Sequence, residues 1–460
     1  MASRFAGSIL TYPARAAFLW YLVLILAGSL VLLHPVCRAP GRPPITAGDA
    51  IFTATSAACV TGLTVRSTGH DFSRVGQVVI LVLIQLGGLG IMTVTTFISL
   101  QLGGRETLRQ RATIAETLGT KQADDLRWVL RNVIVMFLIC EGAGFAILAA
   151  RHLVHQQPWP EAFWNALFHA VSAFCNAGFA LADDSLIPYQ SDPVVTLTLA
   201  ALIIFGGLGA PVLLDLRRHW RTPWREKWQH LTLHTKLMLV GTAFLLAVGT
   251  AAFLMFEGRN TLAGMPWDRR LLIAFFHATT CRTAGFNNVE VAALTNATLF
   301  LTILLMAVGA GPCSTAGGFK VSTFMVLTLR AWASLRGYPQ LMVFRRTVPR
   351  ALVDFSLSTV LVFGIVAILA LVGLLALEQA DRPHTQSHGL FLDTLFEVVS
   401  ALGTVGLSTG LTPQLGPEGR AFLIALMFIG RLGPITFFHV LSHSRQSQHF
   451  EYPKEDVLIG

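Results

Sequence analysis

Apolar residues run through this chain in long stretches that short polar or charged segments separate. Several stretches reach about 18 residues or more, the length at which a helix crosses a lipid bilayer. Clear examples are Ala17–Leu33, Val129–Ala150, Leu237–Phe256 and Leu352–Leu377. The first is too long for the core of a signal peptide, so we expect it to remain as a helix. The pattern predicts an all-α membrane protein.

The composition agrees with this prediction, because only 13% of the 460 residues are charged, whereas soluble domains carry about 25%. The net charge of +9 would suggest nucleic-acid binding in a soluble protein. Here the Lys and Arg residues lie between apolar stretches, so membrane topology explains the charge. The six cysteines are scattered without a CxxC pair, which argues against a disulfide framework or a zinc site. We expect contact with membrane lipid and none with nucleic acid.

A short pattern occurs four times along the chain. Each copy opens with Phe, continues through small apolar residues with Ser or Thr, and closes on Gly followed by Leu or Phe. The copies are FTATSAACVTGLTV from Phe52, FHAVSAFCNAGFAL from Phe168, FHATTCRTAGFNNV from Phe276 and FEVVSALGTVGLST from Phe396. Because the whole pattern repeats and not the glycine alone, chance helix-packing glycines are a poor explanation.

A second glycine-rich motif follows each first glycine by 24 to 28 residues, around Gly87, Gly206, Gly309 and Gly430. An apolar helix precedes each first motif, and another contains each second motif. The unit is therefore a helix, a short re-entrant segment with a Gly turn, and a second helix. We predict four such M1–P-loop–M2 repeats, with eight transmembrane helices and four re-entrant pore loops, over residues 1–104, 105–218, 219–336 and 337–460.

The distribution of Lys and Arg predicts the orientation of these repeats. The segments that join one unit to the next carry sixteen Lys and Arg residues in total. The segments between a first helix and its re-entrant segment carry seven in total. Positive charge marks cytoplasmic loops. Both termini are then cytoplasmic, all four repeats are parallel, and the Gly turns enter from outside.

Four parallel units in a pseudo-fourfold arrangement around a central pore would bring the Gly turns together. Irregular backbone cannot face lipid, so such turns must be buried or line water. A ring of carbonyl oxygens can replace the hydration shell of K⁺, and none of these turns contains Asp or Glu. The predicted filter residues are Val60, Thr61, Gly62, Leu63, Asn176, Ala177, Gly178, Phe179, Thr283, Ala284, Gly285, Phe286, Thr404, Val405, Gly406 and Leu407.

The second glycine-rich motifs of the third and fourth units differ from those of the first two units. In the third unit this motif contains ten consecutive residues that a continuous helix disfavours. We therefore predict a break in M2 and a flexible gating loop under the filter. These residues are Gly309, Ala310, Gly311, Pro312, Cys313, Ser314, Thr315, Ala316, Gly317 and Gly318. In the fourth, Arg431 is an intramembrane cation that would hold the loop through its carbonyl groups. For Lys320 a role in the pore and one in helix packing are both open.

Three further residues lie close to the Gly turns. We expect His169 and His277 to be hydrogen-bonded residues of the short helices, in preference to proton relays or metal ligands. For Arg282 we expect a salt bridge that supports the filter. The candidate partners are Asp183, Asp184 and Glu290.

These motifs resemble those of the Trk/Ktr/HKT superfamily of potassium uptake proteins, and within it the membrane subunits of Ktr systems. The resemblance covers nearly the whole chain and includes STAGGFK, FIGRLGP and the tail EYPKEDVLIG. It implies potassium uptake across the bacterial inner membrane, stimulation by Na⁺, a homodimer and a cytosolic ring of RCK-type nucleotide-binding subunits. No organic cofactor is expected in this chain. Cys59 and Cys313 depart from the small or hydroxyl residues that are usual at these positions.

Three other functions compete with a gated pore. A secondary active transporter (K⁺/Na⁺ or K⁺/H⁺ symport) with alternating access needs ionisable residues in the core, where only Arg431 and Glu141 stand out. An intramembrane enzyme is disfavoured because no HExxH motif or P-loop occurs. A voltage-gated channel would need an Arg-rich helix in each repeat, and none is present. The symporter remains the alternative.

Overall fold

The computed structural model of the chain describes residues 13–90, 126–379, 383, 387 and 389–433, and helices dominate them. Both chain ends and much of the connection between the first two predicted repeats lie outside the described residues. Within the described part the only strands are β1 (Met342–Val343) and β2 (Arg346–Thr347), which pair as a hairpin. The prediction of a predominantly helical chain is confirmed.

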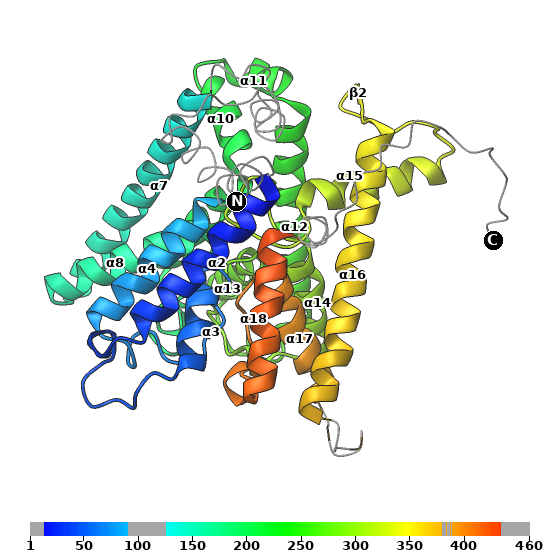
Figure 1. Cartoon of the computed structure of the whole chain (residues 1–460). Coiled ribbons are helices and arrows are strands. Elements are labelled where there is room, and N and C mark those ends of the chain that lie inside the picture. Colours follow the sequence, from blue (N-terminus) through cyan, green and yellow to red (C-terminus); the bar gives the residue numbers. More distant parts are fainter. Residues whose placement is uncertain (1–12, 91–125, 380–382, 384–386, 388, 434–460) are drawn as a thin grey trace, which may run out of the picture.

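Four long helices lie on the outside of the molecule: α2 (Pro13–Leu32), α7 (Leu126–Val154), α12 (Leu233–Glu257) and α16 (Arg350–Gln379). Figure 1 shows α7 and α16 on opposite sides. Their outward side chains are apolar: Leu30, Ile139 and Leu369 are 72%, 63% and 66% exposed. Such surfaces are expected where a helix faces lipid.

Four short helices form the buried centre: α3 (Ala47–Ala58), α8 (Trp159–Phe174), α13 (Trp267–Thr280) and α17 (Leu390–Gly403). The Phe that opens each repeated pattern lies on one of them and is 0% exposed in every case. Each helix ends at a predicted Gly turn, where the backbone leaves helical geometry. Helix α3 begins with a capping box, in which Thr46 and Asp49 satisfy each other's backbone N–H groups.

A third set of helices follows the Gly turns: α4 (Arg74–Gly88), α9 (Pro193–Leu208), α14 (Asn296–Ala307) and α18 (Pro417–Leu432). Short 3₁₀ turns precede the last three of these: η3 (Ile187–Tyr189), η4 (Val291–Ala293) and η6 (Thr412–Gln414). Each helix of this set packs against the short helix of the following unit, and the series closes on itself: α4 on α8, α9 on α13, α14 on α17, and α18 on α3.

The third set is shorter than the sequence predicted. Its helices contain 12 to 16 residues, whereas about 20 residues span a bilayer. Among the described residues three helices are long and apolar enough to cross a membrane, or four if one bent pair counts as a span. The glycine-rich second motifs end or break these helices, so the arrangement of eight transmembrane helices stays a prediction.

The sequence predicts a break in the third unit, and the structure shows a further break, in the second unit, that the prediction did not include. Helix α9 ends before Gly209, and α10 (Ala210–Arg218) continues at an angle of 96° to it. Gly209 has φ +88°, which L side chains resist, and Pro211 cannot continue the hydrogen-bond ladder of α9. In the third unit α14 ends at Ala307, and α15 (Val321–Leu335) begins fourteen residues later.

The remaining elements are peripheral. The turn η1 (Pro35–Cys37) follows α2, and α11 (Trp224–His230) precedes α12. Figure 1 shows α10, α11 and the β hairpin near the same end of the molecule.

We expect Asp192→Asn to destabilise the protein by about 1 kcal/mol at neutral pH, because Asn can still cap α9 while the ion pair with Arg151, now at 2.8 Å, is lost. Burial alone would raise the pKa of Asp192, but hydrogen bonds from Arg151 and His155 lower it to about 2. A carboxyl group whose pKa is lower in the folded protein stabilises the fold at pH values above its unfolded pKa, which is near 4. This contribution is lost as the pH falls toward 2. The unfolding temperatures of the wild-type protein and Asp192→Asn in detergent should therefore converge between about pH 4 and pH 2. A difference that stays constant over this range would contradict the assignment.

Candidate functional site

The four predicted Gly turns meet at one place. An ideal Cβ built on Gly62 would lie 3.1 Å from Cα of Gly178, and one on Gly178 would lie 2.8 Å from Cα of Gly285. A Cβ on Gly285 would lie 3.2 Å from Cα of Gly406, and one on Gly406 would lie 3.0 Å from Cα of Gly62. These four residues form a closed set in chain order, called the glycine ring below.

A backbone carbonyl oxygen occupies the space where each ring glycine would carry a side chain. In every case this oxygen belongs to the residue that precedes the next glycine of the ring. A Cβ on Gly62, for example, would lie 2.5 Å from the carbonyl oxygen of Ala177. One oxygen per turn therefore faces the ring: those of Thr61, Ala177, Ala284 and Val405.

The backbone of each turn is held in an unusual conformation. Every ring glycine has positive φ, and so does the residue two positions before it. Three of these preceding residues are β-branched: Val60, Thr283 and Thr404 have φ of 55°, 67° and 50°, and Asn176 has 58°. Left-handed backbone is rare for β-branched residues, and such strain persists mainly where the surroundings enforce it, commonly at functional sites.

Serines that the sequence analysis did not single out hold the turns in place. The Oγ atoms of Ser56 and Ser400 accept hydrogen bonds of 3.1 Å from the N–H groups of Gly62 and Gly406. Ser172 Oγ donates to the carbonyl of the residue after its ring glycine, at 2.8 Å. The available signal was the constant spacing, since each Ser lies six residues before its glycine.

The turns lie at the carboxyl ends of the four short helices. The unpaired carbonyls of a helix end carry a partial negative charge of about half an electron. All sixteen predicted filter residues are buried except Gly178, which is partly exposed. The structure thus brings all four predicted turns together and surrounds them with carbonyl groups.

The second glycine-rich motifs contact the same helix ends. A Cβ on Gly87 would collide with the carbonyl oxygen of Ala58, one on Gly206 with that of Phe174, and one on Gly430 with that of Leu402. Each of these carbonyls lies four residues before a ring glycine. The two motifs occur together because the second allows a helix to approach the backbone that supports the ring.

The predicted gating loop, residues 309–318, crosses between the units. The Gly311 N–H donates to the Gly207 carbonyl at 2.7 Å, and the Ala210 N–H donates to the Cys313 carbonyl at 3.1 Å. Gly317 lies against the side chain of Thr404, so the loop touches the fourth turn. Ala310, Thr315 and Ala316 are buried as well, whereas partial exposure is found at Pro312, Cys313, Ser314 and Gly318.

Two cations bind carbonyl oxygens of this loop. Lys320 Nζ donates to the carbonyls of Ala316 and Gly317 at 2.8 and 3.2 Å. Arg431 donates through Nη1 to the Thr315 carbonyl. Its Nη2 donates to the Gly87 carbonyl at 2.5 Å, and its Nε bonds to the Tyr21 hydroxyl at 2.9 Å.

Other residues near the turns differ partly from expectation. His169 Nδ1 lies 2.8 Å from the Asn165 carbonyl, and His277 Nε2 lies 3.0 Å from Thr302 Oγ1, so the prediction of hydrogen-bonded histidines is confirmed. The predicted salt bridge of Arg282 is wrong. Within the described residues Arg282 forms no ion pair, and its candidate partner Asp183 lies in a loop. Asp183 binds His70 there at 2.8 Å.

The core contains more buried acids than the sequence suggested. Glu141 is 7% exposed and accepts a hydrogen bond of 3.1 Å from Gln85. Glu397 on α17 is fully buried and accepts hydrogen bonds from Ser408 and, at 2.6 Å, Thr412. It ties a short helix to the chain that leaves the fourth turn. Its place in the repeated pattern, directly after Phe396, did not reveal this contact.

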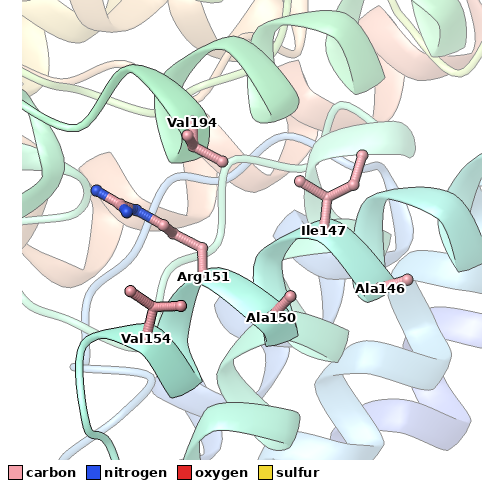
Figure 2. A pocket seen from close by; sticks show the side chains of 6 residues that line it. All are labelled: Ala146, Ile147, Ala150, Arg151, Val154 and Val194. Atoms are coloured by element: carbon pink, nitrogen blue, oxygen red, sulfur yellow. The ribbon is translucent and has the colours of Figure 1, made fainter.

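Figure 2 shows a groove of about 480 Å³ that is not part of this site. It lies between α7 and α9, and several of its side chains are exposed on the outer surface. Its lining residues are Ala146, Ile147, Ala150, Arg151, Val154 and Val194. None of them contributes to the glycine ring or the gating loop.

Comparison with known proteins gives a consistent family. Residues 24–450 match TrkH, a family described as cation transport protein. The chain is 39% identical to Ktr system potassium uptake protein B of Vibrio alginolyticus, over 97% of this chain and 94% of that protein. It is 33% identical to potassium/sodium uptake protein NtpJ of Enterococcus hirae, over 97% of each. The crystal structure of the potassium transporter TrkH from Vibrio parahaemolyticus has a similar fold, with a TM-score of 0.68 at 21% identity, covering 93% of this chain and 84% of that one.

We expect Ser400→Ala to lower the free energy of unfolding by about 1–3 kcal/mol, because it leaves the buried N–H of Gly406 without its acceptor. Ser358→Ala is the matched control, since Ser358 is exposed on α16 and donates to the Asp354 carbonyl of its own helix. Denaturation of both variants in detergent measures the difference. Equal stability of the two would contradict a bracing role for Ser400.

Proposed function

The chain belongs to the TrkH family of cation transport proteins, and from this premise we propose that it takes up potassium ions across the bacterial inner membrane. The observation that carries the proposal is the glycine ring with its four inward carbonyl oxygens. The relatives are named as potassium uptake proteins, and they are transporters and not enzymes.

We propose that the ring is the selectivity filter. Removing water from an ion costs tens of kcal/mol by Born-type estimates, and a fixed set of carbonyl oxygens can offset that cost for K⁺. The strained turns supply such oxygens, and the four helix carboxyl ends add negative potential. The filter residues in this proposal are Val60–Leu63, Asn176–Phe179, Thr283–Phe286 and Thr404–Leu407.

For the architecture, we propose four parallel M1–P-loop–M2 repeats with pseudo-fourfold symmetry around the filter, at the boundaries predicted from the sequence. The closed series of contacts between each third-set helix and the next short helix supports this symmetry. The basic segments that join the units would face the cytoplasm, together with both termini.

The gating loop would close the pathway below the filter. Arg431 supports this role because its guanidinium joins the loop to the first unit through the carbonyls of Thr315 and Gly87. A cation in this position repels K⁺ while it bridges two units. Lys320 binds the same loop, so we assign it to the gate in preference to helix packing alone.

The names of the relatives support a Ktr-type assembly for this chain. We propose a homodimer bound to a cytosolic ring of RCK-type nucleotide-binding subunits. Stimulation by Na⁺ is proposed from the resemblance and from the potassium/sodium description of NtpJ. The loops between units, which include α11 and the β hairpin, offer the contact surface for the ring.

The rival function is K⁺/Na⁺ or K⁺/H⁺ symport with alternating access, and the buried carboxyl group of Glu141 is the observation in its favour. Purified protein in liposomes separates the two. A gated pore moves K⁺ or Rb⁺ down its gradient without an imposed proton or sodium gradient. A symporter moves protons or Na⁺ in fixed proportion to K⁺.

In the same liposomes we expect Gly62→Ser to reduce the preference for K⁺ over Na⁺ by about tenfold or more, which corresponds to roughly 1.4 kcal/mol. The new Cβ would lie 2.5 Å from the Ala177 carbonyl oxygen and push it out of the ring. Gly410→Ser is the matched control. Gly410 has a similar φ of +93°, but nothing lies within 4 Å of its Cβ position. Unchanged ion preference in Gly62→Ser would reject the filter assignment.

Deletion of Cys313–Ala316 should raise K⁺ flux several-fold, because it removes the carbonyls of Thr315 and Ala316 that Arg431 and Lys320 bind. Arg431→Gln should have the same effect. Arg420→Gln is the control for the loss of an arginine from this helix. Arg420 also lies on α18, but it binds the carbonyl groups of Pro413 and Leu415, which directly precede that helix. Flux at the wild-type level in both gate variants would rule out the gate.

A further inference from the structure

One residue breaks the chemical similarity of the four turns. The position three residues before each ring glycine is occupied by Cys59, Cys175, Arg282 and Gly403. Only the third turn carries a charge there. Arg282 follows Cys281, the C-cap of α13, and directly precedes the filter residue Thr283.

The Arg282 side chain is enclosed in the protein. The residue is 4% exposed, and its Nη2 donates to Thr242 Oγ1 on α12 at 3.2 Å. Its Nε is buried without a hydrogen-bond partner. No carboxylate forms an ion pair with it in the part of the chain that the structure describes. No acid among the described residues neutralises this cation, and the residue directly follows the carboxyl end of its own helix, which carries a partial negative charge.

That helix end is also one of the four sources of negative potential at the ring. A cation held at the end of α13 offsets this source for any ion in the filter. The other three short helices have neutral residues at the same position, so their potential is undiminished. A unit charge acting across about 10 Å of partly screened protein changes an ion-binding equilibrium by roughly tenfold.

We propose that Arg282 sets the potassium affinity of the glycine ring by cancelling the contribution of the third short helix. This inference rests on the filter assignment and gives it a new element. An ion must bind well enough to enter a filter and weakly enough to leave it. Arg282 weakens binding from behind the ring and thereby speeds release.

The alternative is that Arg282 only braces the third turn through Thr242. Four variants separate the effect of the charge from that of the bracing. Arg282→Met removes the charge and keeps most of the length, with Arg282→Gln as a second neutral variant. Arg282→Lys keeps the charge but loses the planar donor group. Thr242→Val removes the one hydrogen bond to α12 and keeps the charge.

The test measures K⁺ uptake into liposomes as a function of K⁺ concentration, together with the K⁺ dependence of the unfolding temperature, which reports ion binding without transport. We expect the neutral variants to lower the half-saturating K⁺ concentration about tenfold and to reduce the maximal rate. Their unfolding midpoints should rise at correspondingly lower K⁺. Arg282→Lys and Thr242→Val should remain within about twofold of wild type.

Two results would overturn the proposal. One is a half-saturating concentration that stays at the wild-type value in a folded neutral variant. The other is a shift of the same size in Thr242→Val or Arg282→Lys, which would show that bracing and not charge is responsible. Failure of the underlying function looks different, because the wild-type protein itself would then show neither K⁺ uptake nor stabilisation by K⁺.

Discussion

The contact between a carbonyl oxygen and the bare Cα of a neighbouring glycine determines the rest of this structure. It occurs four times around one closed ring, and at each place any side chain would occupy the position of the oxygen. The turns must then adopt left-handed backbone, even at β-branched residues such as Val60 and Thr404. That strain is tolerated because each turn is buried at the end of a buried helix, and serine hydroxyls brace three of the four.

The same constraint explains why the third-set helices are short. To support the ring, these helices approach the backbone at the ends of the short helices so closely that glycine is needed again, at Gly87, Gly206 and Gly430. Glycine-rich segments favour helix termination, so this close approach weakens each helix just where it passes the ring. The bend at Gly209 and the loop at residues 309–318 follow from this local loss of helix. The loop is thus a more extreme form of a feature that the units share.

The spacing of residues in the sequence was sufficient to predict the helical membrane fold and the break in the third unit. It also led to the hypothesis that the four turns meet. These depend on local preferences of Gly and Pro and on repetition, which one chain displays by itself. The break at Gly209 was missed although Gly and Pro flank it, because only the longest such segment was read as a break. The partners of Arg282 and Glu397 could not be predicted, because buried polar contacts depend on which side chains the tertiary structure brings within about 3 Å. The expected ion pair of Arg282 failed for this reason.

Three cations lie close to a site whose geometry suits a cation, and their different surroundings separate their roles. Lys320 and Arg431 bind loop carbonyls, so their charge is coupled to the position of a segment that contacts several units. Among the described residues Arg282 donates to a hydroxyl group on its own unit, and it is attached to the turn itself. Movement of the loop can relocate or expose the first two, whereas the third stays fixed behind the ring. In the proposed function the first pair therefore gates passage, and the fixed charge adjusts how tightly an ion is held.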